Sequence, residues 1–195
     1  MVAKKKQISL EEKSREILGI LTMVVGIFVL LSLVSHEPTE ELSIMPGVHF
    51  HNWMGYVGIF ISWALFKMFL GWGSLIIASL IGIWGYVVFS EKDFQPVFRL
   101  TGYSFGTTLI LMTLFSLIAE KSGMASEQLF RHSGYLTVSI GQLLKDFLGF
   151  PGSILILLSI GFVTVQAWRG FSFRRLNDWI EDRISELRNK LNIAS

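Results

Sequence analysis

A long apolar stretch, residues 53–89, constrains the fold of this chain more than any other feature. It is interrupted near its middle by Lys67 and by Gly71-Trp72-Gly73. A helix needs about 20 residues to cross a hydrocarbon core of about 30 Å, so the stretch is too long for one span and too short for two. Residues 72–89 are long enough to cross, whereas residues 53–66 would reach only about 21 Å. We therefore predict a short helix that does not cross, followed by a span.

A second stretch downstream has the same construction. Residues 67–72 and 145–150 share Lys, Phe, Leu and Gly in the same order, at a shift of 78 positions. Residues 30–34 match residues 114–118 in the same way, at a shift of 84. Chance similarity between leucine-rich segments is the competing explanation, but the preserved order of the two matches favours an internal duplication.

Composition places the chain in a membrane. Of its 195 residues, 51% are apolar and only 16% are charged, and the uncharged runs are longer than soluble domains carry. We predict an all-α integral membrane protein. The first apolar run exceeds the core of a signal peptide and is interpreted as a retained span. The sequence has no cysteine, which excludes disulfides and thiolate metal sites.

The predicted organisation has three parts. Residues 1–16 are a polar, cytoplasmic segment in which a helix begins, with a capping box from Ser9 to Glu12. Residues 17–168 form the membrane domain, and residues 169–195 form a cytoplasmic amphipathic helix or linker. Within the membrane domain we expect spans at 17–35, 72–89, 97–119 and 150–168, a polar loop at 120–133, and two short outer helices, interfacial or re-entrant, at 53–70 and 134–148.

Lysine and arginine set the predicted orientation. With four spans, the inner side holds thirteen of the 17 Lys and Arg residues, so both termini are expected in the cytoplasm. A six-span arrangement, in which the short helices also cross, has nearly the same charge bias. Helix length favours four spans, because helices of about 15 residues leave hydrocarbon unspanned. Four spans make the repeats parallel, as in an anchor, whereas six would make them inverted, as in a transporter.

The sequence offers no catalytic chemistry. The central portions of the spans lack Asp, Glu, Lys, Arg and His, which ion and proton transporters commonly use. There is no phosphate-binding loop, and no Ser/His/Asp or Cys/His set on plausible scaffolding. His49 and His51, with Glu41 nearby, are better explained as solvated loop residues than as a metal site. We therefore predict no catalytic, cofactor-binding or metal-binding residues, no cofactor, and no enzyme activity in this chain.

The candidate functional residues concern helix packing and the membrane interface. Glycines let helices approach closely, and here either internal packing or a contact between subunits would use them. Lys67 and Lys145 are expected to snorkel towards head groups, with binding of acidic lipid as the less favoured role. The candidate packing residues are Gly82, Gly85, Gly102 and Gly106, and the candidate interfacial anchors are Trp53, Trp63, Lys67, Lys145, Trp168 and Arg169.

Several motifs together resemble the N-terminal membrane domain of the FtsK/SpoIIIE family of bacterial DNA translocases, over about residues 15–172. The motifs are Glu16-Ile17-Leu18-Gly19, Leu31-Ser32-Leu33-Val34-Ser35-His36-Glu37-Pro38, Asn52-Trp53-Met54-Gly55-Tyr56-Val57-Gly58, Leu65-Phe66-Lys67-Met68-Phe69-Leu70-Gly71, Gly141-Gln142-Leu143-Leu144-Lys145-Asp146-Phe147-Leu148-Gly149 and Trp168-Arg169-Gly170. The Asn-Trp-x-Gly-x-x-Gly motif is the most specific of them.

The resemblance implies a four-span anchor in the bacterial inner membrane that assembles into hexamers at the division septum. In the family, a linker and an ATP-driven motor that moves chromosomal DNA follow this anchor. The motor is not in this sequence, so the chain is expected to be a fragment or a stand-alone relative. The first hypothesis is thus a membrane-anchoring and oligomerising domain of a septal DNA translocase, active in cell division and chromosome segregation. Its expected partners are the lipid bilayer, further copies of itself and septal proteins, with no direct nucleic-acid binding. The alternative is a small six-helix inverted-repeat transporter or channel.

Overall fold

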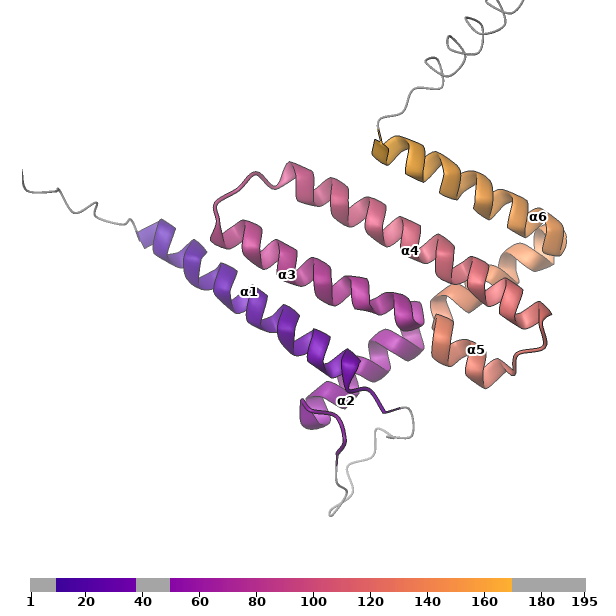
Figure 1. The fold of residues 1–195 in the computed structure, drawn as a ribbon, viewed down its shortest axis with the longest axis horizontal. Helices are drawn as coiled ribbons and strands as arrows, with labels where there is room; N and C mark the ends of the chain where they lie inside the picture. The colour runs from indigo at the N-terminus through magenta and orange to yellow at the C-terminus, as the bar shows by residue number, and fades with distance from the viewer. Residues whose placement is uncertain (1–9, 38–49, 170–195) are drawn as a thin grey trace, which may run out of the picture.

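The computed structural model describes residues 10–37 and 50–169, and its regular elements in these ranges are all helical (Figure 1). The long helices are connected through short helical segments and tight turns. In chain order the elements are α1 (Leu10–Val34), α2 (Gly55–Trp63), the π-helical segment η1 (Ala64–Leu70), the 3-10 segment η2 (Gly71–Ser74), α3 (Leu75–Phe89), α4 (Gln95–Lys121), α5 (Ser126–Ser133) and α6 (Tyr135–Arg169).

Four helical stretches are long and apolar enough to cross a bilayer. They are Leu10–Val34, Gly55–Phe89, Gln95–Lys121 and Tyr135–Trp168, with mean hydropathy between 1.5 and 2.9 in their most apolar windows. A helix of about 20 apolar residues suffices to span, so the predicted all-α membrane fold with four spans is confirmed. The Gly55–Phe89 and Tyr135–Trp168 stretches each contain a short helical segment before the segment that spans.

Two glycines divide these long stretches at equivalent points of the proposed duplication. Gly71 (φ 56°, ψ −130°) ends the segment formed by α2 and η1. Gly149 (φ 68°, ψ 169°) divides α6 into residues 135–148 and 150–169, and Pro151 lies in the first turn of the second part. Both backbone conformations have a positive φ that glycine adopts readily and other residues avoid. The repeated Lys-x-Phe-Leu-Gly motif therefore marks the same structural event, a sharp turn from short helix into span.

Each half of the domain is an antiparallel pair of long helices. In the first half, close approaches join Gly19 to Phe89, Met23 to Gly85 and Gly26 to Gly82, so position rises along α1 as it falls along α3. In the second half, Gly161 lies near Ile110 and the Lys121 Nζ lies 4.1 Å from the centroid of the Phe150 ring. These pairs give α4 and the second part of α6 the same antiparallel relation.

The antiparallel pairing bears on the number of spans. If the segment between α1 and α3 also crossed the membrane, α1 and α3 would have to run in the same direction. They run in opposite directions, and α1 and α4 begin at the same end of the bundle (Figure 1). The two halves are therefore parallel repeats of one hairpin, and the geometry disfavours the six-span inverted-repeat alternative.

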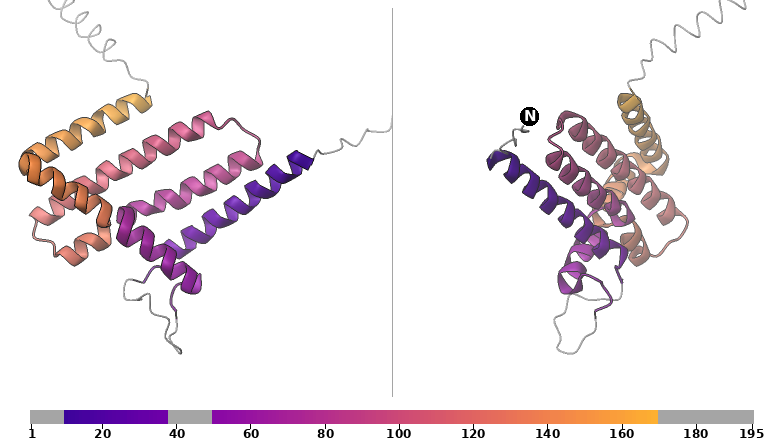
Figure 2. Two further views of the ribbon diagram at one scale, coloured as in Figure 1. Left: turned by 180° about the vertical axis from the view of Figure 1, so that it is seen from behind. Right: turned by 60° about the vertical axis from the view of Figure 1, so that its left-hand side comes forward.

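The bundle has two distinct ends. The start of α1, the turn between α3 and α4, and the end of α6 lie together at one end, which we call the turn end (Figure 2). Helices α2 and α5 and the first part of α6 lie at the other, which we call the short-helix end (Figures 1 and 2). Both short segments thus join their spans on the same side of the bundle.

Each half contributes a small core, with a third cluster at the short-helix end. The first contains Val29, Leu33, Phe66 and Ala78, the second Ile110, Leu117 and Leu157, and the third Ala119, Leu129 and Val138. Many other apolar side chains of the spans face outward. Leu21, Leu111 and Leu155 are 55%, 55% and 65% exposed, as expected where lipid tails rather than water surround the helices.

One predicted loop is partly helical. We expected residues 120–133 to be a polar loop, but Ser126–Ser133 forms α5. Its Leu129 side chain is only 3% exposed and packs against Ala119 and Val138. Helix α5 has only eight residues and one strongly buried leucine. It is therefore too short to show a helical period of apolar residues in the sequence.

Candidate functional site

The α1–α3 seam depends on glycine. A methyl group on Gly19 would lie 2.5 Å from the Phe89 backbone nitrogen, one on Gly26 would lie 2.8 Å from that of Gly82, and one on Gly85 would lie 2.6 Å from that of Met23. Real side-chain carbons do not approach backbone this closely. Small residues at such positions let two helix backbones come into van der Waals contact, which drives helix association in lipid. Any larger side chain at Gly19, Gly26 or Gly85 would therefore require the α1 and α3 backbones to move apart.

The four predicted packing glycines have different surroundings. Gly85 faces α1 directly. The backbone of Gly82 contacts Gly26, but a methyl group added to Gly82 itself would point into open space. Gly102 and Gly106 have no atom of the described residues within 4 Å of that direction, so they face outward from α4. Sequence reasoning did not identify Gly19 and Gly26 as packing residues, although they lie seven residues apart on one face of α1. That spacing of two helical turns was the available signal.

The two halves meet through backbone at a second pair of glycines. Gly71 (φ 56°) and Gly134 (φ 78°) lie against each other where η1 ends and α6 begins. A methyl group on Gly71 would overlap the His132 carbonyl, and one on Gly134 would lie 2.7 Å from the Gly71 nitrogen. Next to them, a methyl group on Gly73 would lie 2.6 Å from Thr108 Cγ2 of α4. The two halves are thus held together by close main-chain contact at the short-helix end.

The Asn-Trp-x-Gly-x-x-Gly motif ties α2 to the end of α1. The Asn52 side chain is 3% exposed; its Nδ2 donates to the Ser32 carbonyl at 2.9 Å, and its Oδ1 accepts from the Met54 amide at 3.0 Å. Gly55 has φ 62°, and any side chain on Gly58 would overlap Asn52. A buried amide with several good partners is costly to replace. The motif therefore fixes how the chain enters α2 after the end of α1.

The same junction is secured differently in the two halves. In the first, His36 Nδ1 lies 3.0 Å from the Ser62 hydroxyl, and the His36 ring stacks on Phe66 with centroids 4.7 Å apart. In the second, Lys145 Nζ lies 2.6 Å from Glu120 Oε1. The shifts of 84 and 78 positions align His36 with Glu120 and Lys67 with Lys145. Both pairs of contacts join the end of a first span to the short helix that follows it.

The predicted anchors lie at the two ends of the bundle. Trp53 is 67% exposed, Trp63 is half-buried with the Lys67 Nζ 5.9 Å from its ring centroid, and Lys67 itself is exposed at the short-helix end. Trp168 is 56% exposed at the turn end. Arg169 ends α6, but its side chain lies outside the described part. Exposed aromatic and cationic side chains in these positions suit the two lipid–water interfaces.

The loop that contains Glu41, His49 and His51, considered above as a possible metal site, lies largely outside the described residues. Glu41 and His49 are not described, whereas His51 is. Within residues 10–37 and 50–169, no group of three or more His, Cys, Asp or Glu side chains is placed to hold a metal ion.

Comparison with known protein families decides the classification. A family model described as the 4TM region of DNA translocase FtsK/SpoIIIE matches residues 11–181. The chain belongs to this FtsK/SpoIIIE 4TM family. The match includes every element that the structure describes apart from the first residue of α1. No curated protein and no solved structure matches the chain.

Membership fixes the broad character of the chain. It is a multi-pass membrane domain of the FtsK/SpoIIIE type, and the matched region is the membrane region of those translocases rather than their ATPase motor. The matched residues include the glycine contacts between α1 and α3, the contact between Gly71 and Gly134, and the hydrogen bonds of Asn52. These contacts give this 4TM domain its shape.

Proposed function

We propose that this chain is the membrane-anchoring and oligomerising domain of a DNA translocase that acts at the division septum during chromosome segregation. The observation that carries the proposal is the 4TM family match over residues 11–181. It is supported by the bundle geometry, in which the start of α1 and the end of α6 lie at one end (Figure 2). An anchor of this form keeps both flanking segments on one side of the membrane, where a motor could be attached.

Charge supports a cytoplasmic turn end. The α3–α4 turn carries Lys92 and the second helical turn of α4 carries Arg99, and both side chains are exposed. The short-helix end carries Lys67, Lys121, Arg131 and Lys145, the last paired with Glu120, so the bias towards the turn end comes from the segments that flank the domain. These segments are polar and rich in Lys and Arg. By the positive-inside rule, the turn end faces the cytoplasm of the inner membrane, and the short-helix end faces outward.

The outward face of α4 supports assembly into oligomers. Gly102 and Gly106 lie one turn apart, with open space beside both. Two helices that present such a Gly-x-x-x-Gly face can approach closely in lipid. The internal seam is already made by Gly19, Gly26 and Gly85, so this second glycine pair is left for contact with another copy of the chain.

Septal targeting is tested by localisation. The chain is fused at its C-terminus to a fluorescent protein that folds only in the cytoplasm and is expressed at low level in dividing bacteria. The proposal predicts a fluorescent band at midcell in constricting cells, with signal enriched several-fold over the lateral membrane. A control fusion to an unrelated four-span protein of similar size should stain the membrane uniformly. Uniform staining by the chain itself would contradict a septal role.

A further inference from the structure

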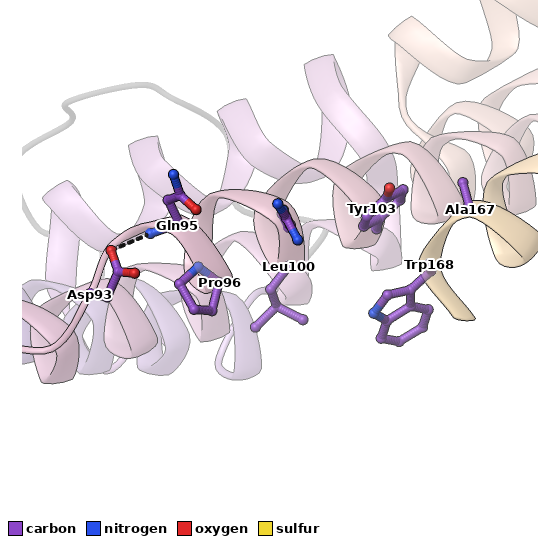
Figure 3. A pocket seen from close by; sticks show the side chains of 8 residues that line it. Asp93, Gln95, Pro96, Leu100, Tyr103, Ala167 and Trp168 are labelled. Carbon is purple, nitrogen blue, oxygen red and sulfur yellow. Dashed lines mark hydrogen bonds between the residues drawn. The ribbon is translucent and has the colours of Figure 1, made fainter. Parts of the chain in front are cut away.

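A hollow of about 480 Å³ lies at the turn end, between the first turns of α4 and the last turn of α6 (Figure 3). Gln95 and Tyr103 of α4 lie on one side of it, and Trp168 of α6 lies on the other. Leu100 provides apolar lining between them. The hollow thus has polar side chains spaced along α4, with apolar lining from Pro96, Leu100 and Ala167 between them.

The polar lining consists mainly of hydrogen-bond donors. Arg99, Gln95, Tyr103 and Trp168 each carry N–H or O–H groups, and Asp93 is the one acidic side chain of the lining. The Asp93 Oδ1 accepts from the Gln95 backbone N–H at 3.1 Å, and this carboxylate is the one negative charge of the lining. Arg99 forms no ion pair within the part of the chain that the structure describes. Three neutral donors accompany Arg99 in the lining, and a guanidinium can bind a phosphate through two parallel hydrogen bonds.

The neighbouring cation is bound differently. Lys92 Nζ donates to the Tyr86 hydroxyl at 3.1 Å and lies 4.6 Å from the centroid of that ring. Lys92 is not part of the lining of the hollow. Two positive charges therefore lie near the same turn. Lys92 is bound to Tyr86, whereas Arg99 lines the hollow.

We propose that this hollow binds the phosphate head group of an anionic phospholipid. Trp168 is 56% exposed and stands at the level where tryptophan commonly meets lipid head groups. An acyl chain attached to a phosphate at Arg99 would continue over Leu100 and along the outer surfaces of α4 and α6. A free phosphate shares the head-group chemistry but gains nothing from that apolar surface. The site has the same chemistry whichever leaflet the turn end faces.

The test is lipid titration of the whole chain in a neutral detergent, followed by native mass spectrometry. Phosphatidylglycerol is compared with phosphatidylcholine, and inorganic phosphate is added as a competitor. We expect the wild type to bind one phosphatidylglycerol more tightly than phosphatidylcholine, and Arg99→Gln to weaken that binding by about tenfold. Lys92→Gln removes the same charge outside the hollow and should change it less than about twofold. Arg99→Lys should be intermediate, because lysine lacks the planar fork.

Three results would overturn the proposal. Equal loss in Arg99→Gln and Lys92→Gln would mean diffuse charge attraction rather than a site. Equal binding of the two lipids would exclude recognition of an anionic head group. Competition by inorganic phosphate at concentrations similar to the lipid would make the site an anion site instead of a lipid site. Circular dichroism and size-exclusion profiles matching the wild type establish that the variants are folded. Trp168→Phe, which removes an indole donor but no charge, provides a second variant and should weaken lipid binding without altering the phosphatidylcholine background.

Discussion

The Nζ of Lys145 lies 2.6 Å from Oε1 of Glu120 and joins the end of α4 to the short first part of α6. Both side chains are about one-third exposed, at 34% and 33%. Ion pairs of such exposure contribute little, about 0.2–1 kcal/mol. We expect a double-mutant cycle with Glu120→Gln and Lys145→Gln, followed by unfolding in detergent, to give a coupling energy in that range. High salt should reduce the coupling. A coupling of zero at low salt would mean that the contact does not fix the short helix.

The α1–α3 seam predicts opposite effects for two glycines on the same helix. Gly85→Ala places a methyl group 2.6 Å from the Met23 nitrogen, whereas Gly82→Ala points into open space. We expect Gly85→Ala to lower the free energy of unfolding by about 1–3 kcal/mol through overpacking. Gly82→Ala should be neutral or stabilising, because alanine is the better helix former by about 1 kcal/mol. Equilibrium unfolding of both variants in mixed micelles checks this, and equal destabilisation would refute the assigned seam.

The two positive-φ glycines of the repeated motif should also differ. Alanine at either position adopts an unfavourable backbone conformation, at a cost of about 1–3 kcal/mol. At Gly149 a methyl group meets little, the nearest contact being Pro151 Cδ at 4.0 Å, but at Gly71 it overlaps the His132 carbonyl. We therefore expect Gly71→Ala to destabilise the domain distinctly more than Gly149→Ala, measured as the shift in thermal midpoint. The reverse order would contradict the contact between the two halves.

Much of this architecture follows from length and apolarity. A bilayer imposes a minimum helix length, so the spans and the short segments before Gly71 and Gly149 were predictable from the sequence. The repeated Lys-x-Phe-Leu-Gly motif was also visible in the sequence, and it ends at a positive-φ glycine in both halves.

Contacts between distant segments were not predictable in the same way. The pairing of Gly26 with Gly82 and of Gly71 with Gly134 depends on which helix faces which. The sequence does not reveal this, because lipid-facing and buried positions of a span are equally apolar. Helix α5 was missed because its burial rests largely on Leu129. Nor did the sequence pattern indicate that Ala64–Leu70 would be π-helical, with the Ser74 hydroxyl donating to the Leu65 carbonyl at 2.5 Å.

The outward glycines of α4 predict a site of contact between copies. The chain has no native cysteine, so Gly102→Cys and Gly106→Cys introduce single thiols. We expect oxidation in native membranes to cross-link these variants into dimers, because glycine faces bring Cα atoms within disulfide range. Leu155→Cys, on the 65% exposed outward face of α6, is the matched control and should stay largely monomeric. Equal cross-linking of all variants would mean random collision rather than a specific contact.

The central claim is that four spans form two parallel hairpins with the turn end in the cytoplasm. Single cysteines at Asp93 of the α3–α4 turn and at Glu127 of α5 test it most directly, since both residues are exposed at opposite ends of the bundle. Intact cells are treated with a membrane-impermeant thiol reagent, and permeabilised cells provide the control for reactivity. The account predicts that Glu127→Cys is labelled in intact cells, whereas Asp93→Cys is labelled only after permeabilisation. Labelling of Asp93→Cys with protection of Glu127→Cys is the six-span result and would contradict the account.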